Sequence, residues 1–153
     1  MATSITTAQA NYFLDHLLNN VTWPYIGDNA GLLASATNGL FWLSLHTADP
    51  GAAGSQNTTE AAYTGYGRIS IARDPVSKKW TISGGAATNA GALAWGISSS
   101  GPETETYVGL GTDQTGAGHL LFRFLITSPA GGLIVNPTIT PQIGIGGLTE
   151  TIA

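Results

Sequence analysis

The sequence predicts a mainly β protein: an antiparallel β-sandwich or jelly roll of about eight strands with a short N-terminal helix. Three observations predict this fold class. A single stretch near residues 7–20 has the periodicity of an amphipathic helix. About eight or nine short strand-like stretches follow it, separated by turns rich in Gly, Pro and Asp. No helical pattern lies between these strands, which excludes a βαβ arrangement.

The helix is predicted from Thr7 to Asn20, with Thr6 or Thr7 as its cap and Trp23-Pro24 as its end. Its apolar residues fall on two adjacent stripes: Phe13, Leu17 and Val21 on one, and Ala10, Leu14 and Leu18 on the other. Such a face can cover the protein's own sheet, which we favour, or reach a neighbouring subunit.

The strands alternate apolar and polar residues, as expected for half-buried sheets. In "FWLSLH", Phe41, Leu43 and Leu45 alternate with Trp42, Ser44 and His46. The clearest alternation is in "HLLFRFLIT", which places Leu120, Phe122, Phe124 and Ile126 on one face, with His119, Arg123 and Thr127 among those on the other. Trp80 and Trp95 lie inside strands, so we expect both in the core.

Several turns and loops separate these strands. "YGRISIARD" and "KKWTIS" flank Asp74-Pro75, which predicts a hairpin. The Gly-rich segment 109–119 predicts a second hairpin connection, because neither the Lys nor the helix that a phosphate-binding loop needs follows it. Residues 51–62, "GAAGSQNTTEAA", form one long polar loop.

The chain has 153 residues, which suits a single domain with a substantial core. Residues 1–25 are the predicted N-terminal arm and helix, and residues 40–153 the β-sandwich body. Neither a linker nor a fixed-period repeat divides the chain.

The composition is low in charge. Charged residues make up 9% of the chain, against roughly 25% in an average domain, and small uncharged residues, including 21 glycines, take their place. Such a surface loses little hydration energy on contact, which favours extensive protein interfaces. The net charge is −4 and the five basic residues are scattered, so we expect no nucleic-acid partner.

Membrane association and disulfides are not expected either. The longest apolar run, "LLFRFLI", contains an Arg and is too short to span a bilayer, and the N-terminus lacks a signal-peptide pattern. The chain has no cysteine, which suits a protein that folds in a cytoplasm.

No catalytic, cofactor or metal site is predicted, and we expect a protein that is not an enzyme. His46 and Asp49 are three apart on a strand-to-turn path, which does not place them on one face, and Asp before Pro-Gly typically starts a turn. Glu103 and Glu105 share a face, where a solvated edge is favoured over paired acid–base groups.

Metal-ligand spacing is also absent from the sequence. His16, His46 and His119 are too far apart in sequence for a zinc pattern, and there is no Cys to complete one. Asn57, Glu60 and Asp113 are possible calcium ligands, yet no calcium-loop run contains them.

The order of the pieces resembles a family of tailed-bacteriophage virion proteins, described as tail-fibre-like or capsid decoration (cement) proteins. The most specific parts are "LHTADPG" at 45–51 and "YGR" at 66–68, and the resemblance covers nearly the whole chain. Two departures, Thr64-Gly65 in place of a Gly-Gly pair and "AGALAWG" without a Pro, affect loops that could touch a partner. The resemblance implies no catalytic residue.

The resemblance implies a virion structural protein assembled in the host bacterial cytoplasm. Our main interpretation is a capsid decoration or cement protein on the capsid surface, which bridges major capsid subunits and forms a homo-oligomer, either a trimer or a dimer. The alternative is a tail or fibre component that recognises a host glycan through loop aromatics. The residues expected to contact a partner are Thr3, Ile5, Trp23, Tyr25, Gln56 and Asn57.

Overall fold

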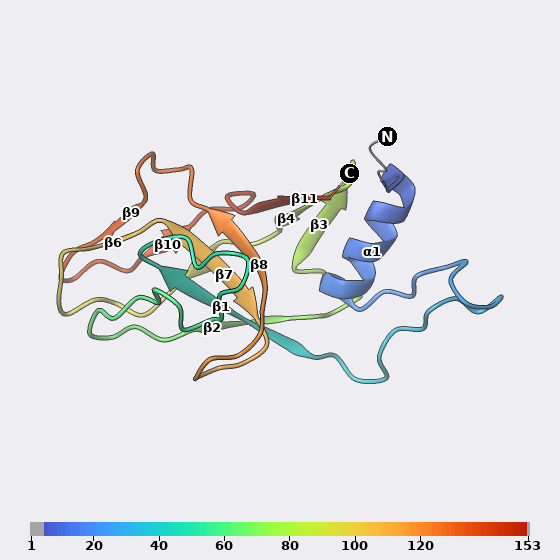
Figure 1. Ribbon diagram of the computed structural model, residues 1–153, viewed down its shortest axis with the longest axis horizontal. Coiled ribbons are helices and arrows are strands. Elements are labelled where there is room, and N and C mark those ends of the chain that lie inside the picture. The colour runs from blue at the N-terminus through green and yellow to red at the C-terminus, as the bar shows by residue number, and fades with distance from the viewer. Residues whose placement is uncertain (1–4, 153) are drawn as a thin grey trace.

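A computed structural model describes residues 5–152 and has the predicted mainly β architecture (Figure 1). Its one helix in this range, α1 (Thr7–Asn19), lies toward one end of the molecule, against β3 and β4. The strands are β1 (Leu40–His46), β2 (Ile69–Ala72), β3 (Trp80–Ser83), β4 (Ala86–Asn89), β5 (Leu93–Ala94), β6 (Glu103–Glu105), β7 (Tyr107–Gly111), β8 (Leu120–Leu125), β9 (Leu133–Val135), β10 (Gln142–Ile143) and β11 (Thr149–Thr151).

The strands form antiparallel sheets in a sandwich-like arrangement. A four-stranded sheet has the order β2-β1-β7-β8, and a three-stranded sheet has the order β11-β4-β3. Two short pairs, β10-β5 and β6-β9, lie beside them. The Gly-rich segment between β7 and β8 is the predicted hairpin connection.

The hairpin predicted around Asp74-Pro75 is wrong. β2 pairs with β1 and β3 pairs with β4, so the segment carries the chain from one sheet to the other. Tertiary contacts hold this crossing: the Arg73 guanidinium donates to the backbone carbonyls of His16 and Leu17 at the end of α1. A local turn signal does not specify which strands pair, because more distant partners decide that.

The helix begins as predicted and ends earlier. The Thr6 side chain accepts a hydrogen bond from the Gln9 N–H and caps α1. Asn20 ends it in the left-handed conformation, with φ 58°, so Trp23-Pro24 lies beyond the helix. The Asn19 side chain then fixes α1 to β3 by bonding both the N–H and the carbonyl of Trp80.

The helix covers the protein's own sheet, which was the favoured alternative. Leu14 and Leu18 are buried in the same cluster as residues from the sheets. Trp80 and Trp95 both lie in this core, as predicted; Trp80 stacks on Phe124 at 5.8 Å between ring centroids.

The outer face of β1 is also buried, which the alternation did not predict. Ser44 and His46 point away from the core but have no exposed surface. The loop that follows β1 covers them: the Gln56 side chain donates to the Trp42 carbonyl and accepts from the Asp113 N–H. Residues 51–62 are therefore folded back onto the sheet.

Two glycines of β7 leave the space that this packing needs. A Cβ at Gly109 would lie 2.5 Å from His46 Nε2 and 2.6 Å from Ser44 Oγ. A Cβ at Gly111 would overlap the Gln56 side chain. The glycines are required here for close approach, which accounts for part of the high glycine content.

A buried ion pair fastens the loop to the hairpin between β7 and β8. Arg68 donates to both carboxylate oxygens of Glu60 at 2.7 Å, and to the carbonyls of Asp113 and Gly116. Tyr66 donates its hydroxyl hydrogen to the same Glu60 carboxylate. The Arg68 side chain is 2% exposed, so this is a desolvated, bidentate pair.

Replacement of Arg68 with Met should lower the free energy of unfolding by about 3–5 kcal/mol, because it leaves the Glu60 charge buried without its partner. Chemical denaturation measures this change. The matched control is Arg123→Met, which removes an arginine from a half-exposed pair and should cost much less. Equal losses in the two variants would contradict the role given to Arg68.

Replacement of Gly111 with Ala should destabilise the protein by about 1–3 kcal/mol, since the new methyl group displaces Gln56 from the sheet. Thermal unfolding and limited proteolysis of the 51–62 loop measure the effect. Gly67→Ala is the control, because nothing lies within 4 Å of a Cβ at Gly67. An unchanged loop in Gly111→Ala would show that Gln56 does not anchor it.

Candidate binding groove

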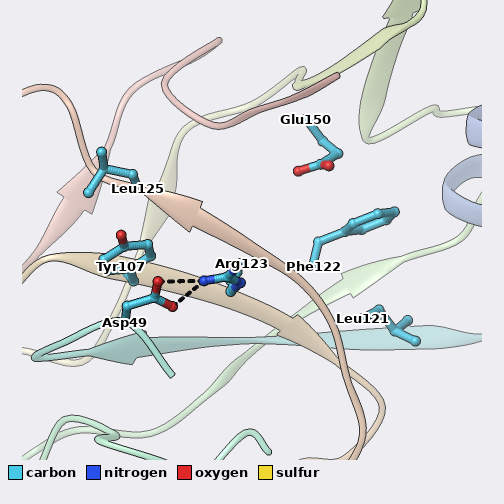
Figure 2. Close-up of a pocket in the computed structure, with 7 residues that line it drawn as sticks. All are labelled: Asp49, Tyr107, Leu121, Phe122, Arg123, Leu125 and Glu150. Carbon is cyan, nitrogen blue, oxygen red and sulfur yellow. Dashed lines mark hydrogen bonds and ion pairs between the residues drawn. The ribbon is translucent and has the colours of Figure 1, made fainter. Parts of the chain in front are cut away.

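An open groove of about 500 Å³ runs along β8, and its size is in the range of small-molecule sites (Figure 2). Four separate segments of the fold contribute to it: the turn after β1, the start of β7, strand β8, and β11. The lining residues are Asp49, Tyr107, Leu121, Phe122, Arg123, Leu125 and Glu150. β8 is an edge strand of its sheet, so the groove is open to solvent along that side.

An ion pair stands at the centre of the groove. Arg123 Nη1 lies 2.5 Å from each carboxylate oxygen of Asp49, and Figure 2 shows the two side chains meeting beside Tyr107. Asp49 Oδ1 also accepts from the Gly51 N–H at 2.8 Å, which is the predicted Asp-Pro-Gly turn. The Arg123 guanidinium is the main cause that lowers the pKa of Asp49, and Asp49 in turn raises the pKa of Arg123.

Glu150 brings a second carboxyl group from β11. Burial raises its pKa, and the positive charge of Arg123 partly opposes this rise. The groove thus combines a guanidinium donor, two carboxyl groups and the Tyr107 phenol with the apolar side chains of β8. This set can bind a polar ligand that both donates and accepts hydrogen bonds and also has a nonpolar surface.

His46 and Asp49 do not converge on a site. His46 Nε2 lies 2.8 Å from Ser44 Oγ, and Nδ1 lies 2.8 Å from the Thr58 carbonyl oxygen. This geometry is that of a nucleophile and base, but both side chains are fully buried under the loop, where no substrate reaches them. Burial lowers the pKa of His46, so the neutral imidazole links β1 to the loop.

Glu105 overturns the expectation of a solvated edge. It lies on β6 with no exposed surface, and neither carboxylate oxygen has a hydrogen-bond partner. Burial, followed by the nearby Glu103 charge, raises the pKa of Glu105 to about 7. Glu103 is the half-buried member of the pair, and its oxygens accept from the Ala62 N–H.

The expected contact residues have different surroundings. Ile5 and Tyr25 are exposed, Tyr25 by 81%, and Asn57 is also exposed. Trp23 packs locally: its ring meets Phe13 edge-on and its indole N–H donates to Gln9. Gln56 is fully buried, which leaves its side chain no surface to offer a partner. Thr3 lies outside the described residues.

The groove was missed because its residues come from separate parts of the sequence. Arg123 was placed on the polar face of its strand and Asp49 in its turn, but no local spacing brings positions 49, 107, 123 and 150 together. One feature of the sequence could have indicated the groove: Arg123 lies between Leu121 and Leu125 on a strand, in a chain with few charges.

Two searches of the described residues concern other kinds of site. No group of three or more His, Asp or Glu side chains in residues 5–152 is placed to hold a metal ion. Over the same range, no helix has both the length and the apolar character needed to cross a membrane.

With its β-rich body, short antiparallel sheets and open surface groove, the protein has the architecture of a structural or binding module. The family model described as "Podophage GP4 fiber I protein gp80" matches residues 4–149, and the chain belongs to this family. The protein is therefore a phage structural protein and a component of the virion. No curated protein matches the sequence. The family description names a fibre, which fits the tail or fibre alternative better than the capsid cement interpretation.

Replacement of Glu105 with Gln should stabilise the protein selectively at high pH. Folding raises the pKa of Glu105 from 4.5 to about 7, so its favourable contribution is complete below pH 4.5 and is lost as the pH rises through 7. The variant should match the wild type near pH 4 and exceed it by roughly 3 kcal/mol above pH 7. Denaturation at a series of pH values measures this, and a difference independent of pH would contradict it.

Proposed function

We propose that this protein is a non-enzymatic subunit of a phage fibre and that it recognises a glycan on the host surface through the groove along β8. The description of the family model names a fibre protein, which supports this proposal. The observation that carries the recognition step is the groove, in which the Asp49–Arg123 pair lies beside Tyr107, Glu150 and the apolar side chains of β8.

The chemistry of a sugar matches this lining. Each hydroxyl group donates one hydrogen bond and accepts others, so it suits a site where a guanidinium donor and carboxyl acceptors lie side by side. The C–H faces of a sugar ring are nonpolar, and Leu121, Phe122 and Leu125 offer them a nonpolar wall. The ion pair orders its own donor and acceptor before any ligand arrives, which reduces the entropy cost of binding.

This proposal assigns glycan binding to the groove along β8 and not to the loop aromatics Trp23 and Tyr25, where the sequence predicted it. Trp23 has its indole N–H and its ring engaged within the protein. Tyr25 is exposed and belongs to the loop between α1 and β1; this loop extends from the end of the molecule opposite β6 and β9 (Figure 1). The role of Tyr25 as a contact residue stays a prediction, and the adsorption experiment described next also tests it.

Phage particles carrying Arg123→Gln should adsorb to host cells at least about tenfold more slowly than the wild type, because the variant loses charge-assisted hydrogen bonds to the ligand. The adsorption rate constant is the measurement. Lys79→Gln, which removes a cation outside the groove, is the control and should adsorb normally. Tyr25→Ala tests the loop contact in the same assay.

Normal adsorption by Arg123→Gln particles that contain the usual amount of this protein would refute the role of the groove. Antibody labelling of intact particles tests the location separately. Signal on fibres is expected, and signal over the head would instead support the capsid decoration interpretation.

A further inference from the structure

The groove carries more negative than positive charge. Its charged lining residues are Arg123, Asp49 and Glu150, which are one cation and two carboxyl groups. A ligand with its own carboxylate or sulfate would enter a region where opposite charge is scarce. Because the central pair is half-exposed, this charge balance acts most strongly at low ionic strength.

The one guanidinium is already neutralised within the protein. Arg123 Nη1 contacts both oxygens of Asp49, and Asp49 is held in its turn by the Gly51 N–H. An acidic ligand would have to replace Asp49 as the partner of Arg123 and leave that carboxylate unpaired beside it. A hydroxyl group needs no such exchange, since it can accept from the remaining guanidinium hydrogens.

Glu150 adds to the discrimination. When ionised it accepts a hydrogen bond from a hydroxyl and repels an anion, and when protonated it donates one without adding positive charge. Burial raises the pKa of this group, while Arg123 lowers it. Neither form offers an acidic sugar the cation that it would require.

A protein strand is a less suitable occupant than a glycan. β8 is an edge strand, and an extended peptide could in principle pair with it. However, Arg123 lies near the middle of β8 and its side chain pairs with Asp49 across the groove, and charged side chains on an edge discourage strand addition.

We infer that the groove selects neutral glycans and discriminates against glycans whose sugars carry carboxylate or sulfate groups. This inference rests on the proposed function, because it names the class of ligand for the same site. The recognised unit is a sugar segment with free hydroxyl groups and an exposed C–H face, in contact with Arg123, Glu150 and Tyr107.

The test uses the purified full-length chain and pairs of oligosaccharides that differ only at C6. β-1,4-Linked mannose and mannuronate hexasaccharides form one pair, and glucose–glucuronate and galactose–galacturonate oligomers of matched linkage form two more. Calorimetry or surface plasmon resonance at constant ionic strength measures Kd. We expect at least one neutral member to bind about tenfold or more tightly than its acidic counterpart.

Glu150→Gln is the variant that reports on the mechanism. It removes a negative charge but keeps a hydrogen-bonding group, so the ratio of the acidic member's affinity to the neutral member's affinity should rise several-fold. Asp28→Asn removes a carboxylate at the extended loop, where it accepts from the Ala30 and Gly31 N–H groups, and should leave the ratio unchanged.

Each outcome has one meaning. Tighter binding of acidic members, or an equal affinity for both, overturns the inference and leaves the proposed function standing. A neutral preference that Glu150→Gln does not alter overturns the assignment of selectivity to the groove. Binding to no pair at all overturns the inference, and if Arg123→Gln phage also adsorb normally, it overturns the proposed function itself. Chemical shift changes confined to β8 on addition of a peptide would point to strand addition instead.

Discussion

The buried ion pair between Arg68 and Glu60 is the interaction on which the 51–62 loop and the hairpin between β7 and β8 depend for their positions. Arg68 bonds Glu60, eight residues earlier in the long loop, and two carbonyls in the hairpin between β7 and β8, which lies 45 or more residues further along the chain. A buried charge of this kind is costly unless every polar atom has a partner. The requirement fixes the loop in one position against the sheet.

The position of the groove follows from this constraint. Next to Glu60, the Thr59 carbonyl accepts from the Thr47 N–H, and the Thr59 hydroxyl donates to the Ala48 carbonyl. These bonds hold the turn that carries Asp49, and Thr106 bonds the Thr47 carbonyl one residue before Tyr107. The buried Arg68–Glu60 pair thus holds, through these bonds, the segments that line the groove. The Asp49–Arg123 pair at the centre of the groove remains accessible.

Two buried titratable groups, His46 and Glu105, change the stability of the protein in opposite directions with pH. The neutral form of His46 is favoured by burial, so its contribution weakens as the pH falls below the ordinary histidine pKa of 6.5. Glu105 prefers its protonated form, so its contribution weakens as the pH rises through about 7. Glu105 immediately precedes Thr106, whose N–H donates to the His46 carbonyl at the end of β1.

The sequence by itself determined the elements. Amphipathic periodicity defined α1, strict alternation defined β8, and Asp49-Pro50-Gly51 defined the turn after β1, because these features arise from neighbouring residues. Only the tertiary structure decided which strands pair after Asp74-Pro75, that Glu105 and Gln56 are buried, and that Asp49 meets Arg123. Those outcomes depend on contacts between segments tens of residues apart, and local patterns carry no information about such contacts.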